Sequence, residues 1–149
     1  MRALAAAALV VGGLALAGCA TPQGEGAGAG ADRTGEVGEV LPRDVPSGWT
    51  GPMPDGQSAG PLVGWIDDEQ FGVITIGSGS CYPEATAIEA TGDASARIDF
   101  EMPPADAICT ADFSPTTHAF TLPPAVTEFP VALELVFGDD VVDAELPAR

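Results

Sequence analysis

The chain has 149 residues and a formal net charge of −17 at pH 7, with 22 acidic residues, five basic residues and no lysine. A surface this acidic repels the phosphates of nucleic acid and of anionic lipid headgroups, which excludes both as favoured partners. The length leaves room for one small domain, and 14 prolines and 19 glycines argue against long helices.

The first 18 residues have the order of a secretory signal peptide. Met1 and Arg2 provide a short positive start, and residues 3–16 are an apolar run interrupted only by two glycines. The run is too short to span a hydrocarbon core, which needs about 20 apolar residues. Small residues follow it, as a cleavage site requires. The sequence therefore predicts export of the chain.

The segment Leu16-Ala17-Gly18-Cys19 resembles the lipobox of bacterial lipoproteins. This resemblance implies cleavage before Cys19 and acylation of that cysteine by diacylglycerol and fatty acid such as palmitate. Two or more acyl chains anchor a protein stably, whereas one chain is marginal. We therefore expect a protein lipid-anchored to the cell membrane on its extracytoplasmic face. The alternative is an ordinary signal peptide with an incidental cysteine.

Residues 19–48 are expected to be a lipidated N terminus followed by a disordered linker. The stretch from Gly24 to Ala31 is glycine, alanine and glutamate, and no large apolar residue appears before Val37. Such a segment cannot bury enough surface to offset the entropy of ordering. Its flexible reach, on the order of 30 Å, would hold a domain of residues 49–149 clear of the bilayer.

The domain of residues 49–149 shows the pattern of an all-β protein. Short β-branched segments alternate with turn residues, and side chains at every second position share one face. On the last long segment that face comprises Phe129, Val131, Leu133, Leu135 and Phe137. The expected strands are 61–66, 71–76, 86–90, 94–102, 118–122, 129–137 and 141–146. They predict a small antiparallel β-sandwich, immunoglobulin-like in topology, with a small barrel as the alternative.

Two cysteines remain once Cys19 is assigned to lipid. Cys81 and Cys109 form an even pair in an oxidising compartment, which predicts a disulfide. The alternative is a reactive or metal-binding pair of thiols. However, the spacing is not Cys-x-x-Cys, and the single histidine, His118, is no obvious metal-binding partner.

A second resemblance covers residues 73–123. The segments Gly77-Ser78-Gly79-Ser80-Cys81-Tyr82-Pro83, Cys109-Thr110-Ala111-Asp112 and Pro115-Thr116-Thr117 are similar to those of a group of small secreted proteins and lipoproteins of actinobacteria. The alanine-rich, lysine-free composition also favours a GC-rich genome. This resemblance implies the disulfide and the β fold, but it implies no activity.

The sequence shows no complete set of nucleophile, base and orienting group for nucleophilic catalysis. His118 falls in a strand pattern with Phe120 and Leu122, which favours a structural side chain over a general base. Ser78 lacks the Gly-x-Ser-x-Gly context of a nucleophile elbow, and no lysine is present for a phosphate-binding loop. A tight turn explains the segment that contains Ser78.

Two acidic clusters and two tryptophans are the remaining candidates for site residues. The clusters Asp67-Asp68-Glu69 and Asp139-Asp140 lie in expected turns, where carboxylates cap and solvate the backbone. Weak Ca²⁺ binding by the first cluster is the alternative, although neither cluster matches a calcium loop. Trp49 and Trp65 are candidates for a sugar-binding face, or else for a linker-docking residue and a core residue.

These observations predict a protein that is not an enzyme and has no cofactor and no structural metal. We expect an interaction or structural module at the cell envelope, tethered to the membrane by the lipid on Cys19. Its partner would be an envelope protein or polysaccharide and not nucleic acid. A weak metal- or small-ligand-binding lipoprotein is the alternative. A small hydrolase is a third hypothesis, with Asp67, Asp68, Glu69 and His118 as the residues to suspect.

Overall fold

The computed structural model describes residues 37–41, 45–55 and 60–149, which fall within the compact unit Thr34–Arg149. The expected signal peptide, Cys19 and most of the expected linker lie outside these described residues. Every regular element in the described ranges is a β-strand, which confirms the all-β prediction. Across the same ranges no helix has the length and apolar character needed to cross a membrane.

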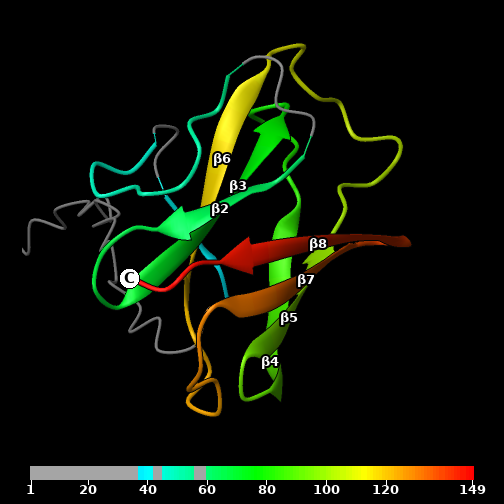
Figure 1. Cartoon of the computed structure of the whole chain (residues 1–149). Helices are drawn as coiled ribbons and strands as arrows, with labels where there is room; N and C mark the ends of the chain where they lie inside the picture. The colour runs from blue at the N-terminus through cyan, green and yellow to red at the C-terminus, as the bar shows by residue number, and fades with distance from the viewer. Residues whose placement is uncertain (1–36, 42–44, 56–59) are drawn as a thin grey trace, which may run out of the picture. The chain divides into compact units, whose positions relative to one another are not determined.

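Eight strands form two sheets of four strands each (Figure 1). The first sheet has the order β1-β6-β3-β2, and the second has the order β4-β5-β7-β8. Their bounds are β1 Glu39–Val40, β2 Leu62–Trp65, β3 Gln70–Gly77, β4 Glu84–Gly92, β5 Ser95–Glu101, β6 Ser114–Thr121, β7 Val131–Phe137 and β8 Asp140–Leu146. The seven expected strands thus all occur, with shifted ends.

The strand order is not that of an immunoglobulin sandwich. In that fold the first, second, fourth and fifth strands share one sheet, whereas here β4 and β5 belong to the second sheet. In addition, β5 and β7 pair in parallel, while the other strand pairs are antiparallel. The parallel pair arises because the chain leaves β5, forms β6 in the opposite sheet and returns as β7. The immunoglobulin-like expectation is therefore corrected, while the two-sheet architecture holds.

The hydrophobic core lies between the two sheets. Alternate residues of β5 and β7 are buried, as the period of two predicts, and they pack against β2, β3 and β6 of the other sheet. The expectation for Phe129 is wrong, because β7 begins only at Val131 and the Phe129 side chain is 45% exposed. Pro130 has no backbone N–H to donate to the ladder, which explains the later start. Phe129 packs instead on the outer part of Trp65, with ring centroids 5.9 Å apart.

Trp49 covers the outer face of the first sheet. Gly64 and Gly72 are directly opposite each other in the β2–β3 register, and the Trp49 ring lies over both. A Cβ atom on Gly72 would come within 2.9 Å of this ring, so the two glycines create the flat platform that it needs. Trp49 is thus a docking residue, as one of its two interpretations predicted.

The ordered structure includes residues that the sequence assigned to the linker. Glu39 and Val40 form β1, which pairs with Ala119 and His118 of β6. The Leu41 N–H then donates to the Thr117 carbonyl at 2.9 Å. A strand of two residues is too short to show an alternating pattern, so β1 could not be predicted from the sequence.

Candidate functional site

The acidic cluster after β2 caps a turn. Oδ1 of Asp67 accepts hydrogen bonds from the backbone N–H groups of Glu69 and Gln70, each at 2.7 Å. These bonds favour the charged carboxylate and hold the pKa of Asp67 below its ordinary value. Among the described residues, no group of three or more His, Cys, Asp or Glu side chains is placed to hold a metal ion. The two hydrogen bonds of Asp67 are those of a turn cap, as the turn interpretation predicts.

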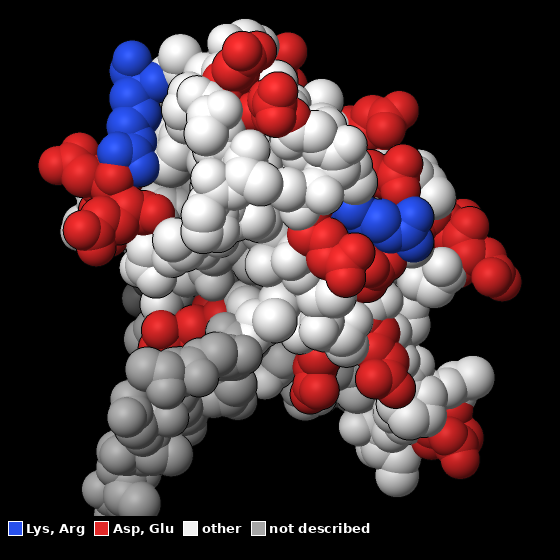
Figure 2. All heavy atoms as spheres, turned by 90° about the horizontal axis from the view of Figure 1, so that it is seen from below, with Lys and Arg blue, Asp and Glu red and all other residues white. Residues whose placement is uncertain are grey.

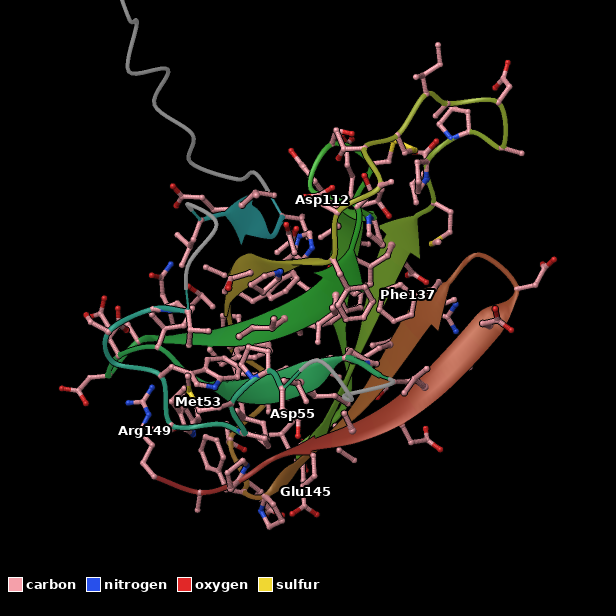
Figure 3. All side chains as sticks on the ribbon, turned by 90° about the horizontal axis from the view of Figure 1, so that it is seen from above. Met53, Asp55, Asp112, Phe137, Glu145 and Arg149 are labelled. Carbon is pink, nitrogen blue, oxygen red and sulfur yellow. A yellow bond between two sulfur atoms is a disulfide. The ribbon has the colours of Figure 1, made fainter. Side chains whose placement is uncertain are left out.

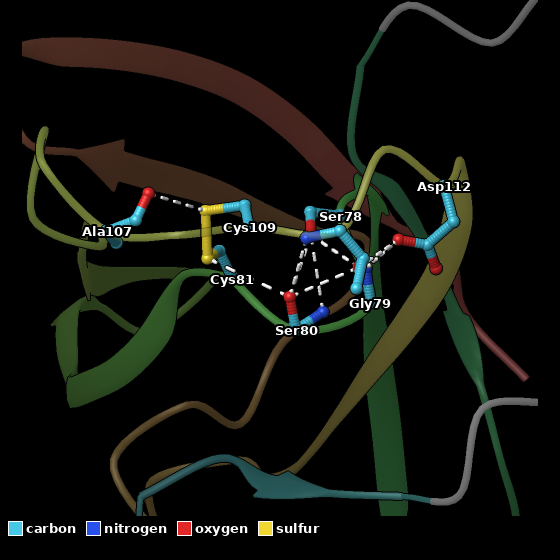
Figure 4. Close-up of a disulfide and its surroundings, with 8 residues drawn as sticks. Ser78, Gly79, Ser80, Cys81, Ala107, Cys109 and Asp112 are labelled. Carbon is cyan, nitrogen blue, oxygen red and sulfur yellow. Dashed lines mark hydrogen bonds between the residues drawn. A yellow bond between two sulfur atoms is a disulfide. The ribbon is translucent and has the colours of Figure 1, made fainter.

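The disulfide between Cys81 and Cys109 is present, with Cα atoms 5.4 Å apart (Figure 4). It joins the loop that follows β3 to the long loop between β5 and β6. The hydroxyl of Ser78 lies 3.1 Å from that of Thr110, and the Thr110 N–H donates to Ser80 Oγ at 2.9 Å. Ser78 therefore belongs to a network that fastens two loops together, as a structural residue would.

Asp112 completes this loop junction. Its carboxylate accepts hydrogen bonds from the Ser114 hydroxyl at 2.6 Å, from the Thr110 hydroxyl, and from the Gly79 N–H at 3.0 Å. These donors, the Ser114 hydroxyl foremost, hold the pKa of Asp112 well below its usual range. No role for Asp112 could be predicted from the sequence, because its hydrogen-bond donors come from segments that are far apart in the chain.

His118 is fully buried between the sheets. It lies on the inner face of β6, with the Phe100 ring centroid 5.3 Å away and the Tyr82 ring centroid 6.2 Å away. Neither Nδ1 nor Nε2 has a hydrogen-bond partner among the described residues. Burial lowers the pKa of His118 to about 4, so the imidazole is neutral near pH 7. A buried neutral imidazole fits the structural interpretation and not a surface general base.

This burial makes the stability of the protein depend on pH. The unfolded chain protonates His118 near pH 6.5, whereas the folded chain does so only near pH 4. The free energy of unfolding should therefore be highest above pH 6.5 and should fall by on the order of 3 kcal/mol as the pH drops to about 4. Urea unfolding across this range measures the loss.

The matched variant for this prediction is His118→Phe. It keeps an aromatic ring in the core and cannot be protonated, so its free energy of unfolding should change little between about pH 7 and pH 4. Asp67 and Asp112 have lowered pKa values, so their stabilising effect is lost only at more acidic pH. Equal slopes in the two proteins would show that His118 is not the responsible group.

A cavity of about 430 Å³ opens between the sheets at one end of the sandwich. β3, β5 and β7 end there and β6 begins there, so the loops between them surround the opening. Phe137 and Asp112 mark this end in Figure 3. The lining of the cavity includes Thr75, Tyr82, Met102, Phe113, Thr116 and Phe137. Its volume falls in the range of small-molecule sites, roughly 300–1,000 Å³.

The cavity has a rigid apolar wall and an apolar rim. Phe137 stacks on the core residue Phe100, with ring centroids 4.6 Å apart, which fixes one wall. Met102 and Phe113 lie at the rim and expose 49% and 64% of their side chains to solvent. Exposed side chains of this size beside a preformed cavity are typical of a binding site.

Two threonines lie deeper in the cavity. Thr75 of β3 and Thr116 of β6 are direct partners in the strand register, and both side chains are buried. Thr116 falls in the Pro115-Thr116-Thr117 segment of the second resemblance, which implies no role for it, and Thr75 falls in no quoted segment. The one available signal is the period of two, which puts Thr75 on the same face of its strand as Phe71 and Val73.

The tryptophan at the other end of the sandwich is covered by the chain itself. The guanidinium of Arg149 lies 3.9 Å from the centre of the Trp65 ring, and the indole N–H of Trp65 donates to the Pro147 carbonyl at 2.9 Å. Trp65 is a core residue, as one interpretation predicted. The hollows of about 680 and 640 Å³ beside it are both lined by Arg149. Its ring face is therefore unavailable to a sugar in this conformation.

The fold and the site together define a two-sheet β-sandwich with an apolar cavity at one end. No protein-family model, no curated protein sequence and no solved structure matches this chain. Its function is therefore inferred from its own residues.

Proposed function

We propose that the chain is a lipid-anchored extracytoplasmic protein whose sandwich is a non-enzymatic binding module. The observation that carries the proposal is the apolar cavity between the sheets, which has the volume of a small-ligand site and an exposed apolar rim. The lipobox at Cys19 supports the anchor. The disulfide supports the compartment, because structural disulfides persist where the environment is oxidising.

Binding is favoured over catalysis by the chemistry of the cavity. A nucleophile needs an adjacent base and an orienting group, and the described lining residues include no histidine and no carboxylate. His118 lies behind Tyr82, buried and neutral. These side chains are suited to contacting a ligand and not to moving its protons.

Charge restricts the partners of this module. Acidic side chains are spread over the surface seen in Figure 2, with few basic groups between them. The net charge of −17 disfavours nucleic acid and anionic lipid. An envelope protein is a second candidate partner, favoured by Ile108, which is 98% exposed in the loop that also carries Met102 and Phe113.

The anchor is tested by replacing Cys19 with serine. Because the thioether forms only on the cysteine sulfur, Cys19→Ser should abolish acylation and leave the unprocessed precursor. Metabolic labelling with palmitate and the apparent mass on a gel report the two effects. The variant Cys81→Ser, altered at a cysteine outside the lipobox, should still be labelled. Normal labelling and processing of Cys19→Ser would rule out the lipoprotein assignment.

The binding module is tested with naphthalene, an apolar fluorescent ligand without hydrogen-bonding groups. A chain produced directly as residues 19–149, with Cys19→Ser and an intact disulfide, should bind it, as measured by titration of its fluorescence. Phe113→Ala removes part of the rim and should weaken binding about fivefold, the equivalent of about 1 kcal/mol of lost apolar contact. Phe129→Ala, at an exposed phenylalanine of the opposite end, should leave the affinity unchanged. Failure of naphthalene to bind would contradict the proposal.

A further inference from the structure

The inner end of the cavity is polar, and its polar groups lack partners. Thr75 and Thr116 are 9% and 5% exposed and face each other across β3 and β6. Both line the cavity, and neither hydroxyl forms a hydrogen bond within the described residues. Neither is among the fully enclosed polar atoms that lack a partner, so both hydroxyls are open to the cavity. Valine would fill the same space without a polar group, so the two threonines present hydroxyls with which a ligand in the cavity can form hydrogen bonds.

His118 extends this polar region further into the sandwich. It is the next inward-facing residue after Thr116 on β6, and both of its ring nitrogens are unpartnered among the described residues. Tyr82, itself a lining residue, packs in an edge arrangement on the imidazole, with ring centroids 6.2 Å apart. The mouth, in contrast, is formed by the exposed side chains of Met102 and Phe113. The cavity is therefore polar at its inner end and apolar at its mouth.

The ligand that matches this arrangement carries no charge. None of the described residues that line the cavity is charged, so a buried ammonium or carboxylate would find no counter-charge there. The net charge of −17 disfavours an anion still further. A threonine hydroxyl can both donate and accept, which suits an alcohol, an amide or an ester carbonyl.

We propose that this cavity binds an uncharged amphiphile, with its hydroxyl or carbonyl group between Thr75 and Thr116 and its apolar body between Tyr82, Phe113 and Phe137. This inference rests on the proposed binding function and assigns the ligand class. The competing ligand is a cationic amphiphile. An adjoining hollow of about 330 Å³ shares Tyr82 and Met102 with the cavity and is lined by Glu84 and Glu101.

The test compares three ligands that share one apolar chain: octanol, octanoate and octylammonium. Each is titrated against naphthalene bound to the chain produced directly as residues 19–149, with Cys19→Ser and an intact disulfide. Octanol should bind tightest, and the two ions should bind at least about tenfold more weakly, because each must leave water without a partner. If octylammonium binds tightest and Glu84→Gln with Glu101→Gln removes that preference, the ligand class proposed here is wrong. Glu128→Gln with Glu145→Gln is the charge-matched control.

The threonines are tested by the double variant Thr75→Val and Thr116→Val. Its affinity for octanol should fall about tenfold, because two hydrogen bonds to the ligand are lost, while naphthalene binds as before. Thr121→Val, at the exposed end of the same strand, should leave both affinities unchanged. Thr116→Ser keeps the hydroxyl and should retain the preference for octanol.

These measurements separate two kinds of failure. If naphthalene does not bind the unmodified site, the proposed binding function fails together with the ligand class. If naphthalene binds and the valine variant keeps the full affinity for octanol, only the role of Thr75 and Thr116 is overturned. Retained naphthalene binding by the double variant also shows that it folds.

Discussion

Replacing Leu133 with alanine should lower the free energy of unfolding by about 2–5 kcal/mol, because the substitution removes buried methyl groups and leaves a cavity. Leu133 lies in the middle of β7 and belongs to the cluster between the two sheets. Its neighbours on that face, Val131 and Leu135, are fully buried, so the surrounding core has little freedom to collapse into the space. Urea unfolding at about pH 7 measures the loss.

The control for Leu133 is the next residue along the strand. Glu134 points to the opposite face and pairs with Arg97 at 2.7 Å, with both side chains more than two-fifths exposed. An exposed pair of this kind contributes about 0–1 kcal/mol, so Glu134→Ala should have a much smaller effect. Similar losses for the two variants would contradict the orientation of β7.

Removing the Cys81–Cys109 disulfide should lower the free energy of unfolding by about 3–4 kcal/mol. The bond joins residues 28 positions apart, and cross-linking a loop of this length restricts the unfolded chain by about that amount in the chain-entropy model. The double variant Cys81→Ala and Cys109→Ala should show the loss in urea unfolding. Treating the unmodified protein with a reductant should produce a loss of the same size.

The same bond also positions the rim of the cavity. Cys81 lines the cavity, and Cys109 lies in the loop between Met102 and Phe113. Loss of the bond should therefore weaken naphthalene binding as well as stability. Mass spectrometry of the unreduced protein should show a deficit of two hydrogens relative to the reduced form. Two alkylatable thiols at these positions in freshly purified protein would contradict the disulfide.

Local sequence pattern was a good guide to individual strands. In β5 and β7 apolar residues recur at every second position, and this period follows directly from the geometry of an extended chain with one buried face. β4 and β5 form a hairpin in which Gly92 pairs with Ser95, so Asp93 and Ala94 make a two-residue turn of the kind that short sequence patterns signal. The pattern failed where it was too short, in β1, and where proline delayed the strand, at Phe129.

Strand pairing was beyond the reach of any local pattern. β6 pairs with β3, and β5 pairs in parallel with β7, although these partners are far apart in the sequence. An apolar face predicts that a strand packs against another layer of the protein, but it does not predict which strand pairs with it in the sheet. The immunoglobulin-like expectation went wrong for this reason.

The sequence alone determined the all-β class and the Cys81–Cys109 pair, because both depend on residue type and spacing along the chain. It predicts the lipoprotein export signal on the same grounds. The cavity depends on something else. Thr75 and Thr116 come from strands distant in the sequence, and they meet only because β3 and β6 are neighbours in register. In the sequence, His118 shows only the pattern of a strand residue. In the folded protein the second sheet covers it, and this burial lowers its pKa. Burial and register are properties of packed sheets, so only the tertiary structure decided which side chains face the cavity.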